Sequence, residues 1–140
     1  MSYLKSYRES EVASADGTRL IVMAYDGAIG FLRRARLAIA EERPAEALSH
    51  VLRAEKIVLH LMASVNPAAG EMAQNLTRLY SYVVERLGKI ANTPEADAID
   101  DALRVLEQLR DAWEQLAVQA QKKSVEAGHT PRVGDLSVCA

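Results

Sequence analysis

Residues 20–40, LIVMAYDGAIGFLRRARLAIA, decide the fold that this sequence predicts. On a helix at about 100° per residue, most of their apolar side chains fall on one arc of roughly 160°. Asp26, Arg33 and Arg34 point away from that arc, which is typical of an amphipathic helix that buries one face. Apolar residues also lie outside the arc, among the polar ones: Val22, Met23, Ile29 and Leu37. This surplus is the first indication of a partner surface.

Two glycines interrupt the predicted helix, Gly27 and Gly30, and each costs about 1 kcal/mol relative to alanine. One interpretation is that the helix tolerates them or bends slightly. The other is close packing, because Gly27 lies on the apolar arc beside Ala24 and Ala28. A neighbouring backbone could approach such small residues, where leucines would block it.

The composition favours a single soluble helical domain. The 140 residues are 49% hydrophobic, carry a formal net charge of -2 and include only 7 glycines and 4 prolines. This near-neutral balance argues against nucleic acid as the main partner, because phosphate binding needs a concentrated basic face. The basic cluster at residues 33–36 is expected to be a solvated helix face, paired with nearby acids such as Glu41 and Glu42.

The single cysteine, Cys139, lies beside the C-terminal residue, so neither an intrachain disulfide nor a thiolate metal site is expected. The first residues lack the apolar region of a secretory signal. No run approaches the roughly 18 apolar residues of a membrane span. We therefore expect a cytoplasmic protein without membrane insertion.

Residues 1–15 show no sustained helical period and are expected to form an irregular N-terminal arm. The arm is either a frayed terminus or a segment that docks Tyr7 and Val12 onto an exposed groove. Residues 125–140 have no apolar period either, which predicts a mobile C-terminal tail. One domain is expected between them, at residues 16–124.

Proline, glycine and capping residues mark the boundaries of four predicted helices in this domain. The helices are expected to run from Asp16 to near Glu42, from Pro44 to the turn at residues 66–70, from there to near Ala91, and from residues 93–95 to about Lys123. Helices of roughly 20 to 30 residues with short connections predict an all-α, antiparallel up-down four-helix bundle.

The second and third predicted helices also carry apolar residues outside their core arcs. Ile57 and Leu61 lie roughly opposite the core arc of the second helix, to which Leu52 and Leu59 are assigned. Tyr82 points away from the arc of the third helix. Exposed apolar patches usually mark partner sites, and a bundle naturally receives an amphipathic helix in a groove. Alternatively, these side chains pack against the arm, the tail or a second copy in a homodimer.

No catalytic or metal site is predicted. A di-iron bundle needs two Glu-x-x-His pairs on facing helices, and the sequence does not contain two. His50 and His60 lie too far apart on one helix to share an ion, and His129 lies in the tail. Trp113 is expected to anchor the core rather than to face a ligand. We therefore expect no enzyme, no metal and no cofactor.

Residues 20–29, LIVMAYDGAI, resemble the LxxMLYDGAI signature of the FliS family of flagellar secretion chaperones. Further matches follow in the family's order along residues 3–118: Tyr7, Val12, Ala54, Ile57, Val58, Gly70-Glu71, Asn75-Leu76, Leu79-Tyr80-Ser81-Tyr82, Ala91-Asn92 and Leu109-Arg110-Asp111-Ala112-Trp113. The sequence departs from the family pattern where Asp16-Gly17 replaces Ser-Pro, where Ala24 replaces leucine, and where Glu55 replaces glutamine. The second of these departures shrinks an apolar contact.

The resemblance implies a cytoplasmic, non-enzymatic chaperone for newly made flagellin. The bundle would hold the C-terminal segment of flagellin, prevent its premature polymerisation and support its delivery to the flagellar type III export apparatus. The arm would cover part of the groove, with Tyr7 and Val12 as a placeholder that flagellin displaces. The residues expected to contact flagellin are Tyr7, Val12, Val22, Met23, Tyr25, Ile29, Leu37, Ile57, Leu61 and Tyr82.

Two functional hypotheses stay open on these grounds. The first is the flagellin chaperone, for which flagellar export-gate or regulatory proteins are further candidate partners. The second is a helical-bundle regulatory or scaffolding module that binds another flagellar or secretion protein.

Overall fold

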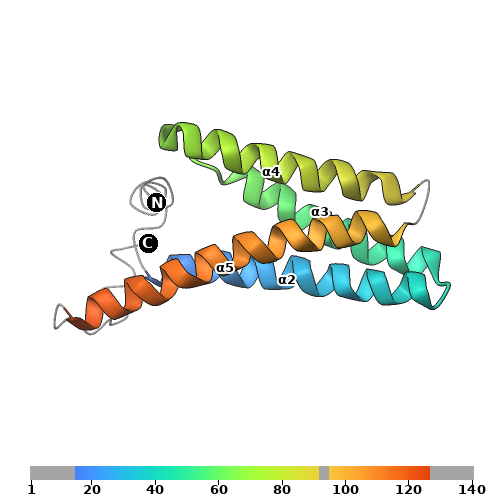
Figure 1. Ribbon diagram of the computed structural model, residues 1–140, viewed down its shortest axis with the longest axis horizontal. Helices are drawn as coiled ribbons and strands as arrows, with labels where there is room; N and C mark the ends of the chain where they lie inside the picture. Colours follow the sequence, from blue (N-terminus) through green and yellow to red (C-terminus); the bar gives the residue numbers. More distant parts are fainter. Residues whose placement is uncertain (1–14, 92–94, 127–140) are drawn as a thin grey trace.

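Four α-helices run alternately up and down along one axis in the computed structural model, which describes residues 15–91 and 95–126 (Figure 1). They are α2 (Ala15–Ala40), α3 (Pro44–Ala63), α4 (Glu71–Gly88) and α5 (Ala96–Glu126), with short 3-10 helices at Pro67–Ala69 and Lys89–Ala91. The described residues contain no strand, so the predicted all-α four-helix bundle is confirmed. The predicted arm and tail lie outside the described residues, except for Ala15 and residues 125–126, which are helical.

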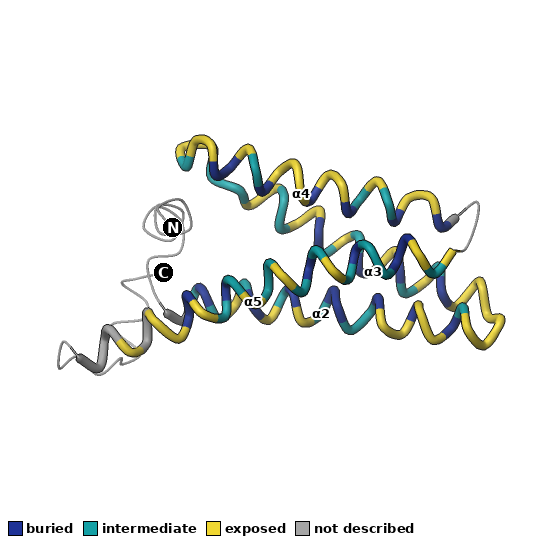
Figure 2. Tube along the Cα trace, viewed as in Figure 1, coloured by how far each residue is buried: buried dark blue, intermediate teal, exposed yellow. Residues whose placement is uncertain are grey.

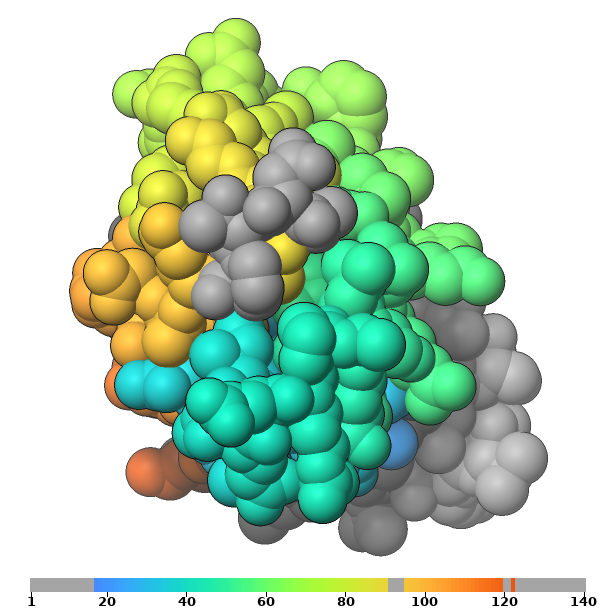
Figure 3. All heavy atoms as spheres, turned by 90° about the vertical axis from the view of Figure 1, so that its right-hand side faces the viewer, coloured from blue at the N-terminus to red at the C-terminus, as the bar shows by residue number. Residues whose placement is uncertain are grey.

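Each helix packs against its neighbours in the chain, and α5 closes the ring onto α2. The helix α2 packs extensively against both α3 and α5, whereas α4 makes less contact with the same two helices. Toward its N-terminal end α4 diverges from α5 (Figure 1). From the end that carries the α2–α3 turn, α5 appears on the left, α3 on the right and α4 above (Figure 3). One end of the bundle is therefore less tightly closed than the other.

The turn between α2 and α3 is a Schellman motif. Arg43 N–H donates to the carbonyl of Ala38 at 2.8 Å, and Glu42 N–H donates to the carbonyl of Ile39 at 3.0 Å. Glu42 has a φ of 59°, in the left-handed region where glycine is the usual residue. Pro44 then opens α3, as predicted from its fixed φ.

The turn between α3 and α4 also follows the sequence signals. The side chain of Asn66 accepts a hydrogen bond from the Ala68 N–H at 3.0 Å, which starts the short 3-10 helix. Gly70 has a φ of 65°, which explains a glycine immediately before α4. The predicted start of the fourth helix falls partly on residues 92–94, outside the described residues, and the helix begins at Ala96.

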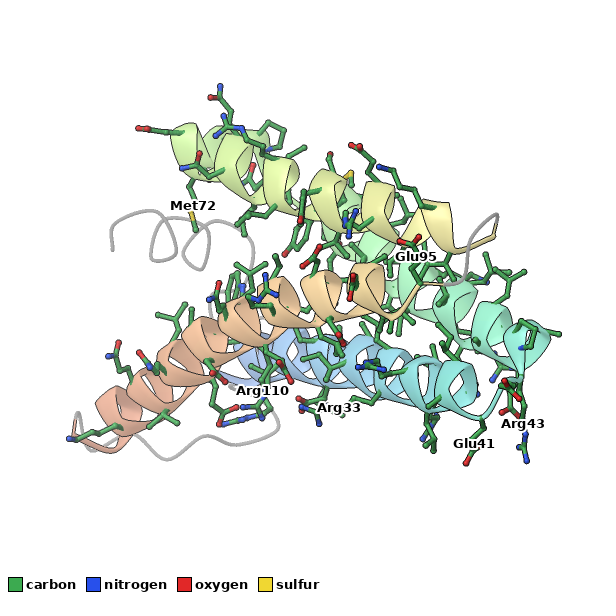
Figure 4. All side chains as sticks on the ribbon, turned by 45° about the vertical axis from the view of Figure 1, so that its right-hand side comes forward. Arg33, Glu41, Arg43, Met72, Glu95 and Arg110 are labelled. Carbon is green, nitrogen blue, oxygen red and sulfur yellow. The ribbon has the colours of Figure 1, made fainter. Side chains whose placement is uncertain are left out.

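The core runs the length of the bundle between the four helices (Figure 2). Its largest fully buried side chains include Trp113, Tyr25, Leu32, Leu87, Ile99 and Leu106. The expectation that Trp113 anchors the core is confirmed. Met72, in the first turn of α4, also points inward toward the other helices (Figure 4). These residues come from three of the helices and from both ends of the bundle.

Ion pairs hold α2 against α5 along one seam. They join Arg19 to Glu114, Arg110 to Asp26, Arg33 to Glu107 and Arg36 to Asp100. The predicted pairing of the basic cluster with Glu41 and Glu42 is therefore wrong for Arg33 and Arg36, because α5 supplies their acids. The carboxylate of Glu41 instead lies 3.8 Å from the guanidinium group of Arg43, at the α2–α3 turn (Figure 4). The hydrogen bond with Asp26 raises the pKa of Arg110 above its ordinary value, so the guanidinium stays charged.

Candidate partner-binding groove

An apolar pocket of about 380 Å³ opens at the end of the bundle where α4 diverges. Leu20 and Ala24 of α2 and Ile57 and Leu61 of α3 line one side of it. The buried side chains of α4 and α5 that line it are Leu76, Tyr80 and Trp113. Leu20 is 61% exposed although it lies against this pocket. An apolar concavity with exposed leucine at its edge is suited to a partner's apolar side chains.

Small residues on α2 leave room for this pocket. Ala24, which stands where the family pattern has leucine, lines the pocket with a single methyl group. A Cβ placed on Gly27 would lie 3.4 Å from Ile57 Cδ1, an ordinary contact distance. Gly27 thus faces a side chain of α3, and the predicted approach of a neighbouring backbone is wrong. A Cβ on Gly30 would meet nothing within 4 Å, so its glycine has no packing explanation.

The surface continues from the pocket along the seam of α2 and α3. Phe31 of α2 stacks on His50 of α3, with ring centroids 6.2 Å apart. The guanidinium groups of Arg34 and Arg53 lie 5.4 Å and 5.8 Å from the centre of the Phe31 ring. We call the surface from the pocket to this cluster the α2–α3 groove; it comprises Leu20, Ala24, Gly27, Phe31, Arg34, His50, Arg53, Ile57 and Leu61.

Two of the residues predicted to bind a partner lie in the groove, and three others are exposed elsewhere. Ile57 and Leu61 line the pocket and are partly buried against the core. Met23 and Leu37 on α2 are 59% and 58% exposed, and Tyr82 on α4 is 43% exposed. None of these three lines the pocket. Tyr7 and Val12 lie outside the described residues, so their contribution stays a prediction.

Three predicted contact residues are buried instead. Val22 is 1% exposed, Ile29 is 5% exposed and Tyr25 has no exposed surface. The expectation that Val22 and Ile29 lie on a free apolar strip is therefore wrong. The reason is that α2 lies between two helices, so its buried arc is wider than one packed face. Tyr25 lies on the core arc, as expected, and its hydroxyl is 2.5 Å from that of Tyr80.

The arcs assigned from the sequence also misplaced several leucines. Helical periodicity places Leu20 on the apolar arc of residues 20–40, and Leu52 and Leu59 on that of the second helix, but the three side chains are 61%, 53% and 45% exposed. On α3 the buried residues are Ala47, Val51, Ala54 and Val58, so the core face is narrow and mostly small. The outer side of α3 is left with Leu52 and Leu59. Their exposure follows from how α3 is rotated in the bundle, which periodicity alone does not fix.

The pocket also contains residues that sequence reasoning did not select, among them Leu20, Leu76 and Tyr80. The sequence feature that could have indicated these pocket residues is the difference in length between the helices. The helices α2 and α5 have 26 and 31 residues, whereas α3 and α4 have 20 and 18. Shorter helices cannot cover the whole of longer ones, so apolar side chains near the start of α2 lose part of their cover.

Within the described residues, the structure gives no support for a metal site or for a membrane-spanning helix. Within residues 15–91 and 95–126, no three His, Cys, Asp or Glu side chains lie close enough together to hold a metal ion. The helices of the described ranges also lack the combined length and apolar character that crossing a membrane requires.

Comparison with known proteins then places the chain. The family model for the flagellar protein FliS matches residues 1–121. The chain belongs to the FliS family. This confirms the resemblance seen at residues 20–29, which extends from the first residues into the second half of α5.

Individual FliS proteins match over most of their length. The chain is 34% identical to the flagellar secretion chaperone FliS of Salmonella typhimurium, over 85% of this chain and 90% of that protein. It is 28% identical to FliSB of Pseudomonas aeruginosa, over 81% and 94%, and 25% identical to FliS of Bacillus subtilis, over 84% and 87%. FliS is a family of chaperones and not of enzymes.

Proposed function

We propose that this chain is a cytoplasmic export chaperone that binds the C-terminal segment of flagellin, prevents its premature polymerisation and supports its delivery to the flagellar type III export apparatus. The observation that carries the proposal is the α2–α3 groove, with its open apolar pocket of about 380 Å³. Membership of a family whose relatives are named flagellar secretion chaperones supports the direction of the proposal.

The groove suits a client that assembles through its own apolar surface. A subunit that polymerises by pairing amphipathic segments must keep those segments covered until export. A bundle that receives one such segment in a groove buries the apolar side chains that drive assembly. Leu20 and Leu61 would cover the client side chains that enter the pocket, and the client segment would become ordered on binding.

The N-terminal arm fits into the same proposal as a competitor for the groove. Tyr7 and Val12 would lie over part of the groove in the free protein, and flagellin would displace them. Removal of residues 1–14 is then expected to strengthen flagellin binding, because the client no longer competes with a tethered segment.

A second apolar surface favours an additional partner. A cavity of about 550 Å³ lies at the α3–α4 turn, lined by Met62, Val65, Ala73 and Thr77 among others. This is the surface that an export-gate or regulatory flagellar protein, or a second copy in a homodimer, would cover. A module that uses only this surface would be the regulatory or scaffolding protein of the alternative hypothesis.

Calorimetric titration tests the proposed function. A peptide that covers the C-terminal region of flagellin from the same organism is titrated into the full chain and into Leu61→Ala. The matched control is Leu52→Ala, which removes the same atoms from an exposed leucine outside the groove. We expect binding with a negative heat-capacity change, and about tenfold weaker binding for Leu61→Ala only. Absence of binding to the full chain, with and without residues 1–14, would contradict the chaperone function.

A further inference from the structure

Cations gather at the end of the α2–α3 groove that lies away from the pocket. The guanidinium groups of Arg34 and Arg53, one from each helix, both lie within 6 Å of the Phe31 ring centre, at 5.4 Å and 5.8 Å. His50 stacks on the same ring from α3. Both arginine side chains are exposed, whereas Phe31 is partly buried against the core. The ring therefore fixes two positively charged groups at one place on the surface.

These cations lack the acidic partners that the other arginines of α2 have. In residues 15–91 and 95–126, no carboxylate forms an ion pair with Arg34, Arg53 or the nearby Lys56. By contrast, Arg33 and Arg36 pair with acids of α5. The α2–α3 groove is thus locally basic on a chain whose formal net charge is -2. Positive charge beside an apolar surface favours a partner that carries negative charge next to its own apolar side chains.

The basic cluster and the pocket belong to one continuous track. Ala24 and Leu61 line the pocket. One helical turn further along α2, Gly27 faces Ile57 of α3. Another turn along, the ring of Phe31 faces the guanidinium group of Arg53. Residues 20–31 of α2 extend over about 17 Å at 1.5 Å per residue, which is the length of about three helical turns. A helix of that length presents apolar side chains at i, i+3 or i+4, and i+7 along such a track.

We infer that the α2–α3 groove selects an acidic amphipathic helix, whose apolar side chains enter the pocket and lie on Ile57 while its carboxylates pair with Arg34 and Arg53. The inference deepens the proposed function, because the helix would be the part of the client that lies in this groove. An arginine stacked on an aromatic ring keeps its planar N–H donors oriented, which favours bidentate contact with a carboxylate. A neutral helix of the same apolar pattern would leave both guanidinium groups without a carboxylate. A basic helix would be repelled by them.

Binding of three synthetic helical peptides to the full chain tests this inference without flagellin. The peptides have 18 residues and the same leucines at i, i+4 and i+7, and they differ only in having Glu, Gln or Lys at the flanking positions. We expect the Glu peptide to bind about tenfold more tightly than the Lys peptide at low salt, with the Gln peptide between them. The net charge of the chain favours the opposite order, so this result would require the local cations.

A charge-matched pair of variants assigns the preference to the cluster. Arg34→Gln combined with Arg53→Gln removes two exposed charges from the groove. Lys89→Gln combined with Lys122→Gln removes two exposed charges from residues that line neither the pocket nor the cavity at the α3–α4 turn. The preference for Glu over Lys should fall below about twofold in the first double variant and persist in the second. An equal preference in both variants, no preference in the unmodified chain, or no binding of any peptide would overturn the inference. Failure of the flagellin titration with success here would count against the proposed client alone.

Discussion

The hydroxyl oxygens of Tyr25 and Tyr80 lie 2.5 Å apart in the buried core and join α2 to α4, which lie diagonally opposite each other in the ring. Tyr80 also lines the apolar pocket, whereas Tyr25 has no exposed surface. The contact therefore fixes α4 relative to α2 at the edge of the proposed binding site. It gives a core residue of the YDGAI signature a structural role, where the resemblance had suggested a contact with the client.

Removal of one hydroxyl of this pair should lower stability. Tyr25→Phe is expected to reduce the free energy of unfolding by about 1 kcal/mol, the usual net value of a buried hydrogen bond. Urea unfolding of Tyr25→Phe, Tyr80→Phe and the double variant measures the coupling between the two hydroxyls. The double variant should lose less than the sum of the single losses. Strict additivity would contradict a direct interaction between the two groups.

Leu106 and Leu20 should separate stability from binding. Leu106 is fully buried, so Leu106→Ala should cost about 2–5 kcal/mol of unfolding free energy, as core truncations do. Leu20 is 61% exposed at the pocket, so Leu20→Ala should change stability by less than about 0.5 kcal/mol while it weakens client binding. Thermal unfolding and titration of the same samples provide both readouts. A large loss of stability in Leu20→Ala would place that residue in the core after all.

An aspartate at Ile29 should act differently from one at Ile57. Ile29 is 5% exposed between α2 and its neighbours, so Ile29→Asp buries a charge and should cost more than about 3 kcal/mol or prevent folding. Ile57 is only partly buried and lines the pocket, so Ile57→Asp should retain the fold and lose client binding. Circular dichroism and titration distinguish the two outcomes. Loss of folding in both variants would remove the distinction between core and groove.

The turn between α2 and α3 offers a stabilising substitution. Glu42 has a φ of 59°, a conformation that glycine adopts without the steric cost that other residues pay. Glu42→Gly is expected to raise the free energy of unfolding by about 0.5–1 kcal/mol. The control is Glu42→Ala, which has the same steric cost as glutamate and should give no gain. An equal change in both variants would mean that side-chain charge, not backbone conformation, determines the effect.

The sequence predicted the helices well because local signals specify them. Pro44 begins α3 as expected, Gly70 precedes α4, and the predicted ends of the first and third helices lie within a few residues of those observed. Such boundaries depend on proline, glycine and capping chemistry within a few residues of each other. The up-down topology followed from helix lengths and short connections in the same way.

The binding surface was predicted less well because it depends on how helices are arranged around each other. Val22 and Ile29 lie outside the arc that a single packed face would bury. They are buried because α2 packs against two helices, α3 and α5. Leu52 and Leu59 looked like core residues, yet α3 turns its small residues inward. The groove itself depends on the divergence of α4 and on the facing of Phe31 and Arg53, which come from different helices. No periodicity within one helix contains that information.

Methyl NMR during titration with the flagellin C-terminal peptide tests the central claim most directly, because it reports where on the bundle the client lies. The α2–α3 groove predicts that the methyl signals of Leu20, Ile57 and Leu61 shift as the peptide binds. The exposed Leu52 on the outer side of α3 and the exposed Val118 on α5 should stay unchanged. Shifts confined to Leu52, or no shifts at saturating peptide, would contradict the claim that this groove binds flagellin.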